Sequence, residues 1–314
     1  MKSNLLSRRK FIGNGTVAAT GALFLPKALF ARNILTVAGN PNSLINGVLI
    51  GVTTYSYRGL PGTAEDMLKY CLACNISGVE LRGDAAELSA GAPQHETGQD
   101  AKEYNKSLAQ WRATVSMDKF KAMRKMYNDA GVSIYAYKPL ALGINNTDEE
   151  IEYAFRAGRE LGVTQITVEH PDSDAQTGRI GKFADKYRIR VGYHAHTQAT
   201  PTLWDMAMSQ SEYNCINLDI GHYVAGTNTS PVPFIEKNHA RITSMHLKDR
   251  KFNNGPNTPW GQGDTPIKEV LALMRKNQYK FPATIELEYK IPEGSDPVKE
   301  VIKCREFAAD ILRT

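Results

Sequence analysis

The stretch RVGYHAH at residues 190–196 alternates apolar with polar or small residues and ends in two histidines. Three later stretches show a similar alternation and carry histidines or acids towards their ends: CINLDIGH at 215–222, ITSMHLKD at 242–249 and ATIELEY at 283–289. Alternation with a period of two is typical of β-strands. Such runs alternate along the chain with segments of helical spacing, which predicts a parallel sheet with crossover helices.

Counting all such runs predicts eight strands, and therefore a closed (β/α)8 TIM barrel of the α/β class, as a single domain over residues 46–312. With 314 residues, 42% of them hydrophobic, the chain is long enough to bury one sizeable core. The expected strands are residues 49–55, 78–82, 133–138, 165–169, 190–196, 215–219, 242–248 and 283–288. The polar segments 84–115 and 250–265 are read as long connections that follow strand ends, where such barrels hold their active sites.

Histidines and acids collect at these strand ends. Side chains two residues apart in a strand share a face, so His194 and His196 point one way, as do Glu286 and Glu288. Small and polar residues occupy the preceding positions on the same face of these strands, as Asn217 does two residues before Asp219. This pattern predicts a polar barrel interior. An unpaired buried carboxylate is costly, and a divalent cation held by carboxylates and imidazoles relieves that cost.

In that order, the four quoted stretches resemble the xylose isomerase-like TIM barrel superfamily, and within it the sugar phosphate isomerase/epimerase family, which includes D-tagatose 3-epimerase-like enzymes and inosose dehydratases. The resemblance implies one divalent ion bound by Asp219, His246 and Glu286. The epimerases usually have a glutamate at the fifth strand, where this chain has His194, and Glu169 is the alternative fourth ligand. Mixed carboxylate and imidazole ligands suit Mn²⁺, Zn²⁺, Co²⁺ or Mg²⁺ without deciding among them.

The resemblance further implies an isomerase or epimerase that acts on a sugar or keto-sugar through an enediolate. Glu286 or Glu169 would remove the proton, and His196 or His222 would return it. The expected substrate-binding residues are Glu80, Arg82, Lys138, Lys248 and Glu288, together with Trp260, or Tyr55 and Tyr57, as stacking rings.

Two other functions stay open. Replacement of the usual glutamate by His194 puts a two-base epimerisation in doubt and favours a metal-dependent keto-sugar lyase or dehydratase. The alternative outside enzymes is a non-catalytic carbohydrate-binding barrel. Separately, the alternative to metal binding for Asp219 is a carboxylate that caps the following helix.

The N-terminus predicts export. SRRKFIG at residues 7–13 resembles a twin-arginine motif, and the apolar segment 16–25 is too short for a permanent membrane helix. We therefore expect residues 1–31 to be an export signal and the protein to be periplasmic. Those residues carry five cations and no acid, so the formal charge of +5 leaves the rest of the chain near neutral. A neutral body argues against a nucleic-acid partner. The resemblance implies a small-molecule carbohydrate partner, no stable membrane insertion is expected after signal removal, and a homo-oligomer stays open.

Overall fold

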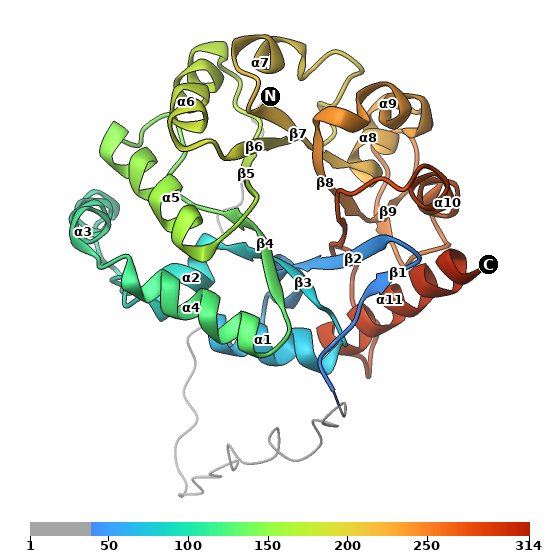
Figure 1. Cartoon of the computed structure of the whole chain (residues 1–314), viewed down its shortest axis with the longest axis horizontal. Helices are drawn as coiled ribbons and strands as arrows, with labels where there is room; N and C mark the ends of the chain where they lie inside the picture. The colour runs from blue at the N-terminus through green and yellow to red at the C-terminus, as the bar shows by residue number, and fades with distance from the viewer. Residues whose placement is uncertain (1–38) are drawn as a thin grey trace, which may run out of the picture. The chain divides into compact units, whose positions relative to one another are not determined.

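The computed structural model describes residues 39–314, and the predicted export signal at residues 1–31 lies outside them. Each parallel strand in this part of the chain pairs with the next, and β2 closes the ring by pairing with both β3 and β11. Figure 1 shows the helices surrounding these strands. The predicted (β/α)8 TIM barrel is therefore confirmed. Its strands are β2 (Val48–Thr53), β3 (Gly78–Arg82), β4 (Ser133–Lys138), β5 (Gln165–Glu169), β6 (Arg190–His194), β7 (Asn214–Asp219), β8 (Ile242–Leu247) and β11 (Ala283–Ile285), with a short antiparallel β1 (Leu44–Ile45) beside β2.

Several strands end earlier than the alternation predicts. The last strand stops at Ile285 rather than at residue 288 because the backbone leaves the ladder there. The amide of Leu287 donates to the Ser56 hydroxyl at 3.0 Å instead of to a neighbouring strand. Likewise β6 stops at His194, so His196 lies in the following loop. As a result, His196 and Glu286 lie beyond the last paired residues of their strands, at the carboxyl end of the barrel.

The barrel interior is polar, as predicted, and its groups bond to one another across the ring. Gln165 and Asn217 both donate to the Ser244 hydroxyl, at 2.7 and 2.8 Å. Apolar residues such as Ile216 and Leu218 alternate with them and are fully buried. Strands that hold polar groups inside and apolar groups outside give the barrel its hydrophobic layer under the helices.

Helix ends carry the expected stop and start signals. The helix α5 begins with a capping box between Thr147 and Glu150 and ends at Gly162, whose φ of 74° favours glycine. The segment 84–115, read from sequence as a loop, holds most of α2 and all of α3. The helices are α1 (Ala64–Ala73), α2 (Gly83–Ser89), α3 (Ala101–Thr114), α4 (Asp118–Asp129), α5 (Asp148–Leu161), α6 (Asp174–Tyr187), α7 (Asp205–Gln210), α8 (Ile220–Thr227), α9 (Val232–Asn238), α10 (Ile267–Asn277) and α11 (Pro297–Arg313), with 3-10 turns at Thr54–Tyr57 and His239–Arg241.

None of the helices between residues 39 and 314 combines the length and apolar character that a membrane crossing requires.

Candidate metal centre

Four buried side chains meet at the carboxyl ends of the late strands. Asp219 of β7 and His246 of β8 are direct partners in the strand register. His246 also pairs with Thr284 of β11, two residues before Glu286. Together with His194, which ends β6, each of these side chains offers a ligand atom within 4.8 Å of the others. The parallel register thus brings together residues that are up to 92 positions apart in sequence.

Both histidines in this group have an oxygen partner on a ring nitrogen, His194 on one and His246 on both. The Nδ1 of His194 lies 2.7 Å from the amide oxygen of Asn217. An amide oxygen only accepts, so Nδ1 carries the proton and Nε2 keeps its lone pair. The Nε2 of His246 lies 3.0 Å from Glu80, which leaves its Nδ1 facing Glu286 at 3.1 Å. A carboxylate or carbonyl behind an imidazole is the usual arrangement for orienting a metal-ligating histidine.

Glu80 therefore differs from its predicted role in substrate binding. Its side chain is fully buried behind His246, and its second oxygen accepts a hydrogen bond from Thr167 at 2.7 Å. A substrate at the barrel mouth has no access to it. Burial disfavours a charged His246, but Glu80 and Glu286 outweigh that effect and raise the pKa of His246 to about 10.

The donor set fits a divalent ion. Oδ1 of Asp219 accepts the backbone N–H of His222 at 2.7 Å, so the helix-capping interpretation of Asp219 is correct for that oxygen. Oδ2 is buried and has no hydrogen-bond donor among residues 39–314, although the ammonium of Lys248 lies 2.9 Å away. A buried carboxylate oxygen needs a compensating cation, and a divalent ion could take this position in place of the ammonium. His194, Asp219, His246 and Glu286 would hold the ion, with the mixed nitrogen and oxygen ligands typical of transition metals and zinc.

Lys248 lies against the same carboxylates. Its buried ammonium is 2.9 Å from Oδ2 of Asp219, 2.7 Å from Glu286 and 2.6 Å from Glu288. The first contact is an ion pair without hydrogen-bond geometry, which is why Oδ2 remains without a donor. Burial raises the pKa of Asp219 to about 6, although Lys248 opposes this. Burial would also raise the pKa of Glu286, but Lys248 and His246 hold it well below its usual range.

A second set of potential ligands consists of His194, His196 and His222. It shares His194 with the first set and contains no carboxylate. Both ring nitrogens of His222 already face cations: Nδ1 lies 2.6 Å from Arg250 and Nε2 lies 3.0 Å from Lys248. Lys248 also contacts the first set, but only that set has carboxylates to balance the charge of a divalent ion, so we assign the centre to the set that contains Asp219 and Glu286.

The same contacts argue against His222 as the proton donor predicted from sequence. Burial lowers the pKa of His222, and the charge of Lys248 lowers it further. The ring therefore stays neutral at physiological pH and has no imidazolium proton to give. Its position between Lys248 and Arg250 instead connects the barrel end to the loop that follows β8.

Glu169 and His196 form the exposed side of the centre. Glu169 lies 2.6 Å from Lys138 and 3.4 Å from His196, and both Glu169 and His196 are about half exposed, at 55% and 54%. The sequence left either His194 or Glu169 as the fourth ligand. His194 is among the four converging residues and Glu169 is not, so the position favours His194. Glu169 and His196 remain within reach of a molecule bound at the mouth.

A cavity of about 410 Å³ opens beside this pair. Arg82 and Lys138, two of the expected substrate-binding residues, contribute its charged wall at the ends of β3 and β4. Leu140 and Ile144, both exposed, add apolar surface. The size lies within the range of small-molecule sites in proteins.

Two of the three predicted stacking rings, Trp260 and Tyr57, are engaged in contacts within the fold. Trp260 packs edge-on against Phe307 of α11, with ring centroids 5.9 Å apart, so its contact is structural. Tyr57 is fully buried and its hydroxyl faces Cys74 at 3.5 Å. Of the three, Tyr55 alone is near the cavity, because its ring lies 5.1 Å from the guanidinium of Arg82.

Asp249 organises the loop after β8, a role that sequence reasoning did not assign. One oxygen accepts the backbone N–H groups of Gly261 and Gly263 at 2.8 and 2.9 Å, and the other accepts that of Thr265 at 3.2 Å. A side chain at Gly263 would collide with this carboxylate. The turn is completed by the short pair β9 (Asp249–Arg250) and β10 (Asn257–Thr258). In the sequence, the spacing of Gly261 and Gly263 was the feature that could have indicated this tight turn.

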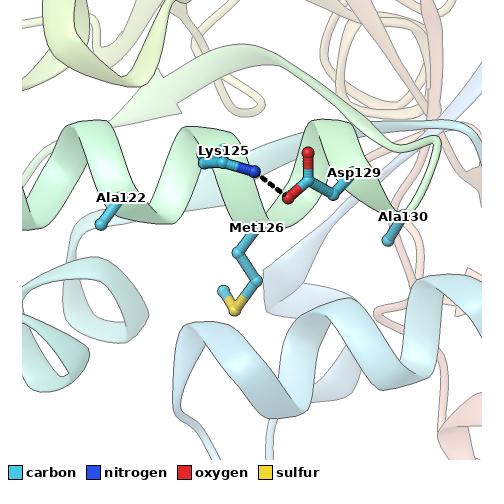
Figure 2. Close-up of a pocket in the computed structure, with 5 residues that line it drawn as sticks. All are labelled: Ala122, Lys125, Met126, Asp129 and Ala130. Atoms are coloured by element: carbon cyan, nitrogen blue, oxygen red, sulfur yellow. Dashed lines mark hydrogen bonds and ion pairs between the residues drawn. The ribbon is translucent and has the colours of Figure 1, made fainter.

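Another hollow, of about 500 Å³, is open to solvent on helix α4 (Figure 2). Its lining contains one ion pair, between Lys125 and Asp129, and Met126. Both charged side chains are largely exposed, so nothing in this hollow concentrates charge or offers several ligands. It carries no catalytic candidate.

Comparison with known proteins agrees with this architecture. The sequence model of a family described as xylose isomerase-like TIM barrel matches residues 90–306. No curated protein matches the chain.

Solved structures with the same fold include three whose names state an enzyme activity. A sugar phosphate isomerase/epimerase from Parabacteroides distasonis is 18% identical, with a TM-score of 0.57, over 84% of this chain and 94% of the other. A probable 3-DHS dehydratase from Bacillus anthracis is 15% identical, with a TM-score of 0.59, over 82% and 98%. A 3-keto-D-glucoside 4-epimerase from E. coli is 14% identical, with a TM-score of 0.58, over 84% and 99%. At these identities the similarity establishes the fold.

Proposed function

The chain belongs to the xylose isomerase-like TIM barrel family, and from that premise we propose that it is a divalent-metal-dependent isomerase or epimerase acting on a sugar or keto-sugar through an enediolate. One observation carries the proposal: four buried ligand groups, two of them carboxylates, converge within 4.8 Å of one another. A divalent ion held there would supply Lewis-acid stabilisation of negative charge on substrate oxygens.

The chain's own residues would handle the proton. Glu169 is the carboxylate that is exposed at the mouth, where its ion pair with Lys138 at 2.6 Å positions it to act as a general base. His196, 3.4 Å from Glu169, is placed to return a proton to the substrate. We assign Glu286 to ion binding rather than to proton removal because its side chain is buried. Arg82 would bind substrate oxygens from the cavity wall.

A keto-sugar lyase or dehydratase is the second candidate. Epimerisation by two opposed carboxylates needs a second base facing the reacting carbon, and His194 stands on β6 where that glutamate would be. The exposed pair Glu169 and His196 lies on one side only. A single base at the end of β5 and a single acid in the loop after β6 suit elimination, in which one group removes the proton and the other protonates the leaving oxygen. One fold neighbour bears the name of a probable dehydratase.

Proton exchange in deuterated water tests these proposals. The protein, loaded with Mn²⁺, Co²⁺ or Zn²⁺, is incubated with D-fructose, D-tagatose and a methyl 3-keto-glucoside, and the products are analysed by mass spectrometry and NMR. An isomerase or epimerase gives a product of unchanged composition that has gained deuterium. A lyase gives an unsaturated product that has lost water or methanol.

The variant Glu169→Gln should lower the rate by about 100- to 10,000-fold, the usual contribution of a general base. Glu269→Gln on the exposed face of α10 is the matched control and should match the unaltered protein. Binding of a sugar without exchange or elimination under any metal would instead favour the non-catalytic carbohydrate-binding barrel.

We also propose that residues 1–31 direct export to the periplasm, which makes an unphosphorylated sugar the better substrate class. Replacing Arg8 and Arg9 by lysine should keep the protein in the cytoplasmic fraction, as followed by cell fractionation. Unchanged periplasmic recovery would contradict twin-arginine export.

A further inference from the structure

The ammonium of Lys248 contacts the same oxygen atoms that face the ligand histidines. Oε2 of Glu286 lies 3.1 Å from Nδ1 of His246 and 2.7 Å from Nζ of Lys248. Oδ2 of Asp219, the oxygen without a hydrogen bond, has Nζ as its ion-pair partner at 2.9 Å. The two carboxylate oxygens best placed for an ion are therefore both in contact with a cation supplied by the chain.

Two cations on one pair of carboxylate oxygens repel each other strongly, because the surroundings are buried and have a low effective dielectric constant. Lys248 is 3% exposed and Asp219 is fully buried, so water does little to screen this repulsion. A divalent ion at these oxygens would be most stable if the ammonium moved away from them.

Glu288 offers the ammonium another position. Its Oε2 lies 2.6 Å from Nζ, and the carboxylate is 21% exposed at the rim of the centre. Glu288 is not among the converging ligands, so an ion would not compete for it. The stem of Lys248 packs closely on Gly221 of α8, where a Cβ would collide with it, so the stem is fixed and the flexible end of the chain can shift.

We propose that Lys248 is a built-in competitor of the metal ion: its ammonium exchanges with a divalent ion at Asp219 and Glu286 and is received by Glu288 when the ion binds. The inference rests on the proposed metal centre. Lys248 thereby lowers the affinity for the ion, and Glu288 partly restores it.

Metal affinity, measured apart from catalysis, tests the exchange. Competition with a chromophoric chelator gives the dissociation constants for Co²⁺ and Zn²⁺, and the Co²⁺ absorption spectrum reports the ligand set. Lys248→Met should bind both ions about 10- to 100-fold more tightly, a change of the size that groups adjoining metal ligands produce. Lys251→Met is the matched control, because Lys251 pairs with Asp264 on the loop, and its affinity should be unchanged.

Glu288→Gln should have the opposite effect and weaken Co²⁺ binding about 10-fold, because the ammonium loses its alternative partner. In the double variant Lys248→Met/Glu288→Gln, the second change should cost little, which a double-mutant cycle detects as strong coupling. Circular dichroism and thermal melting establish that each variant is folded. If Lys248→Met fails to fold, Glu288→Gln still decides the matter.

Equal or weaker binding by folded Lys248→Met, or unchanged binding by Glu288→Gln, would overturn the exchange while leaving the metal centre intact. Absence of Co²⁺ and Zn²⁺ binding from both the unaltered protein and Lys248→Met would overturn the metal centre itself, and the exchange with it. Binding by Lys248→Met alone would support the exchange in its strongest form.

Discussion

Two clusters of buried charge in this barrel are built on different plans. The helix cluster joins Glu87 of α2, Arg112 of α3 and Glu150 of α5. Arg112 donates to both oxygens of Glu87 at 2.9 and 3.1 Å and to one oxygen of Glu150 at 2.8 Å. The other oxygen of Glu150 accepts the backbone N–H of Thr147 at 3.1 Å. Each carboxylate oxygen of the helix cluster therefore has its own donor.

In the mouth cluster, the carboxylate oxygens do not each have their own hydrogen-bond donor. This cluster consists of Glu80, Asp219, His246, Lys248 and Glu286. One ammonium serves two of its carboxylates, and one oxygen of Asp219 accepts no hydrogen bond. Buried charges whose bonds are complete hold elements of the fold together, whereas convergent groups with an unfilled acceptor are suited to bind something else. The comparison predicts that mutations in the mouth cluster remove the metal ion, whereas mutations in the helix cluster lower stability and leave metal binding intact.

The largest effect is expected on metal content. The double variant Asp219→Asn/His246→Ala removes two of the four ligands, so bound metal, measured by elemental analysis of protein purified without chelator, should fall from about one equivalent to a trace. Sugar proton exchange should fall with it. Folding stability should also fall, by about 3–5 kcal/mol, because removal of His246 leaves the fully buried Glu80 without its cationic partner, so metal content is expressed per folded molecule.

The matched double variant Asp264→Asn/His239→Ala changes the same residue types outside the mouth cluster and should retain its metal. A metal content of zero in the unaltered protein, even after addition of Mn²⁺ or Zn²⁺, would contradict the catalytic assignment.

In the helix cluster the expected effect is on stability alone. Arg112→Met leaves Glu87 and Glu150 buried without their cation, and breaking a buried ion pair in this way costs about 3–5 kcal/mol. Urea unfolding followed by circular dichroism measures the change, and metal content per folded molecule should stay constant. Arg159→Met, which removes an exposed pair with Glu160, should change the free energy of unfolding by no more than about 1 kcal/mol. Loss of metal in Arg112→Met would show that the two clusters are coupled.

The sequence predicts much of the barrel and part of the mouth cluster. Strand alternation is a local property, and it located all eight strands. The residues His194, Asp219, His246 and Glu286 were recognisable because each stands at or just beyond the end of a strand. The contact of Glu80 with Nε2 of His246 could not be recognised from the sequence. These residues are 166 positions apart, and their contact depends on the strand register around the whole ring.

The helix cluster escaped prediction for a related reason. Glu87 and Arg112 lie in the polar segment 84–115, whose composition suggests a loop. Their burial depends on α3 packing against α5. Similarly, whether Trp260 faces a substrate or Phe307 of α11 depends on how the loop folds back onto the helix. Long-range packing of this kind leaves no periodic pattern in the sequence.

A smaller effect on the metal is expected at Glu80. Glu80→Gln keeps a hydrogen-bond acceptor behind His246 but removes the charge, so affinity for Co²⁺ should fall about 10- to 100-fold in chelator competition. Thr167→Val removes the hydroxyl that positions Glu80 and should weaken binding in the same direction by less. Stability of Glu80→Gln should stay close to that of the unaltered protein. An unchanged affinity would mean that Glu80 does not orient the ligand.

The smallest expected effect is the pH dependence of the helix cluster. Burial would raise the pKa of Glu150, but the Thr147 amide and Arg112 lower it below its ordinary value of 4.5. A carboxyl whose pKa is lower in the folded state stabilises the fold above its unfolded pKa, and this contribution is lost as the pH falls through the folded pKa. Glu150→Gln should therefore be less stable than the unaltered protein at pH 7, by about 1 kcal/mol, and the gap should narrow towards about pH 3. Urea unfolding at both pH values measures the gap, with the exposed neighbour Glu149→Gln as the control. A gap of equal size at both pH values would mean that Glu150 stabilises the helices through packing and neutral hydrogen bonds, and the helix cluster would then no longer count as a charge-paired counterpart of the mouth cluster.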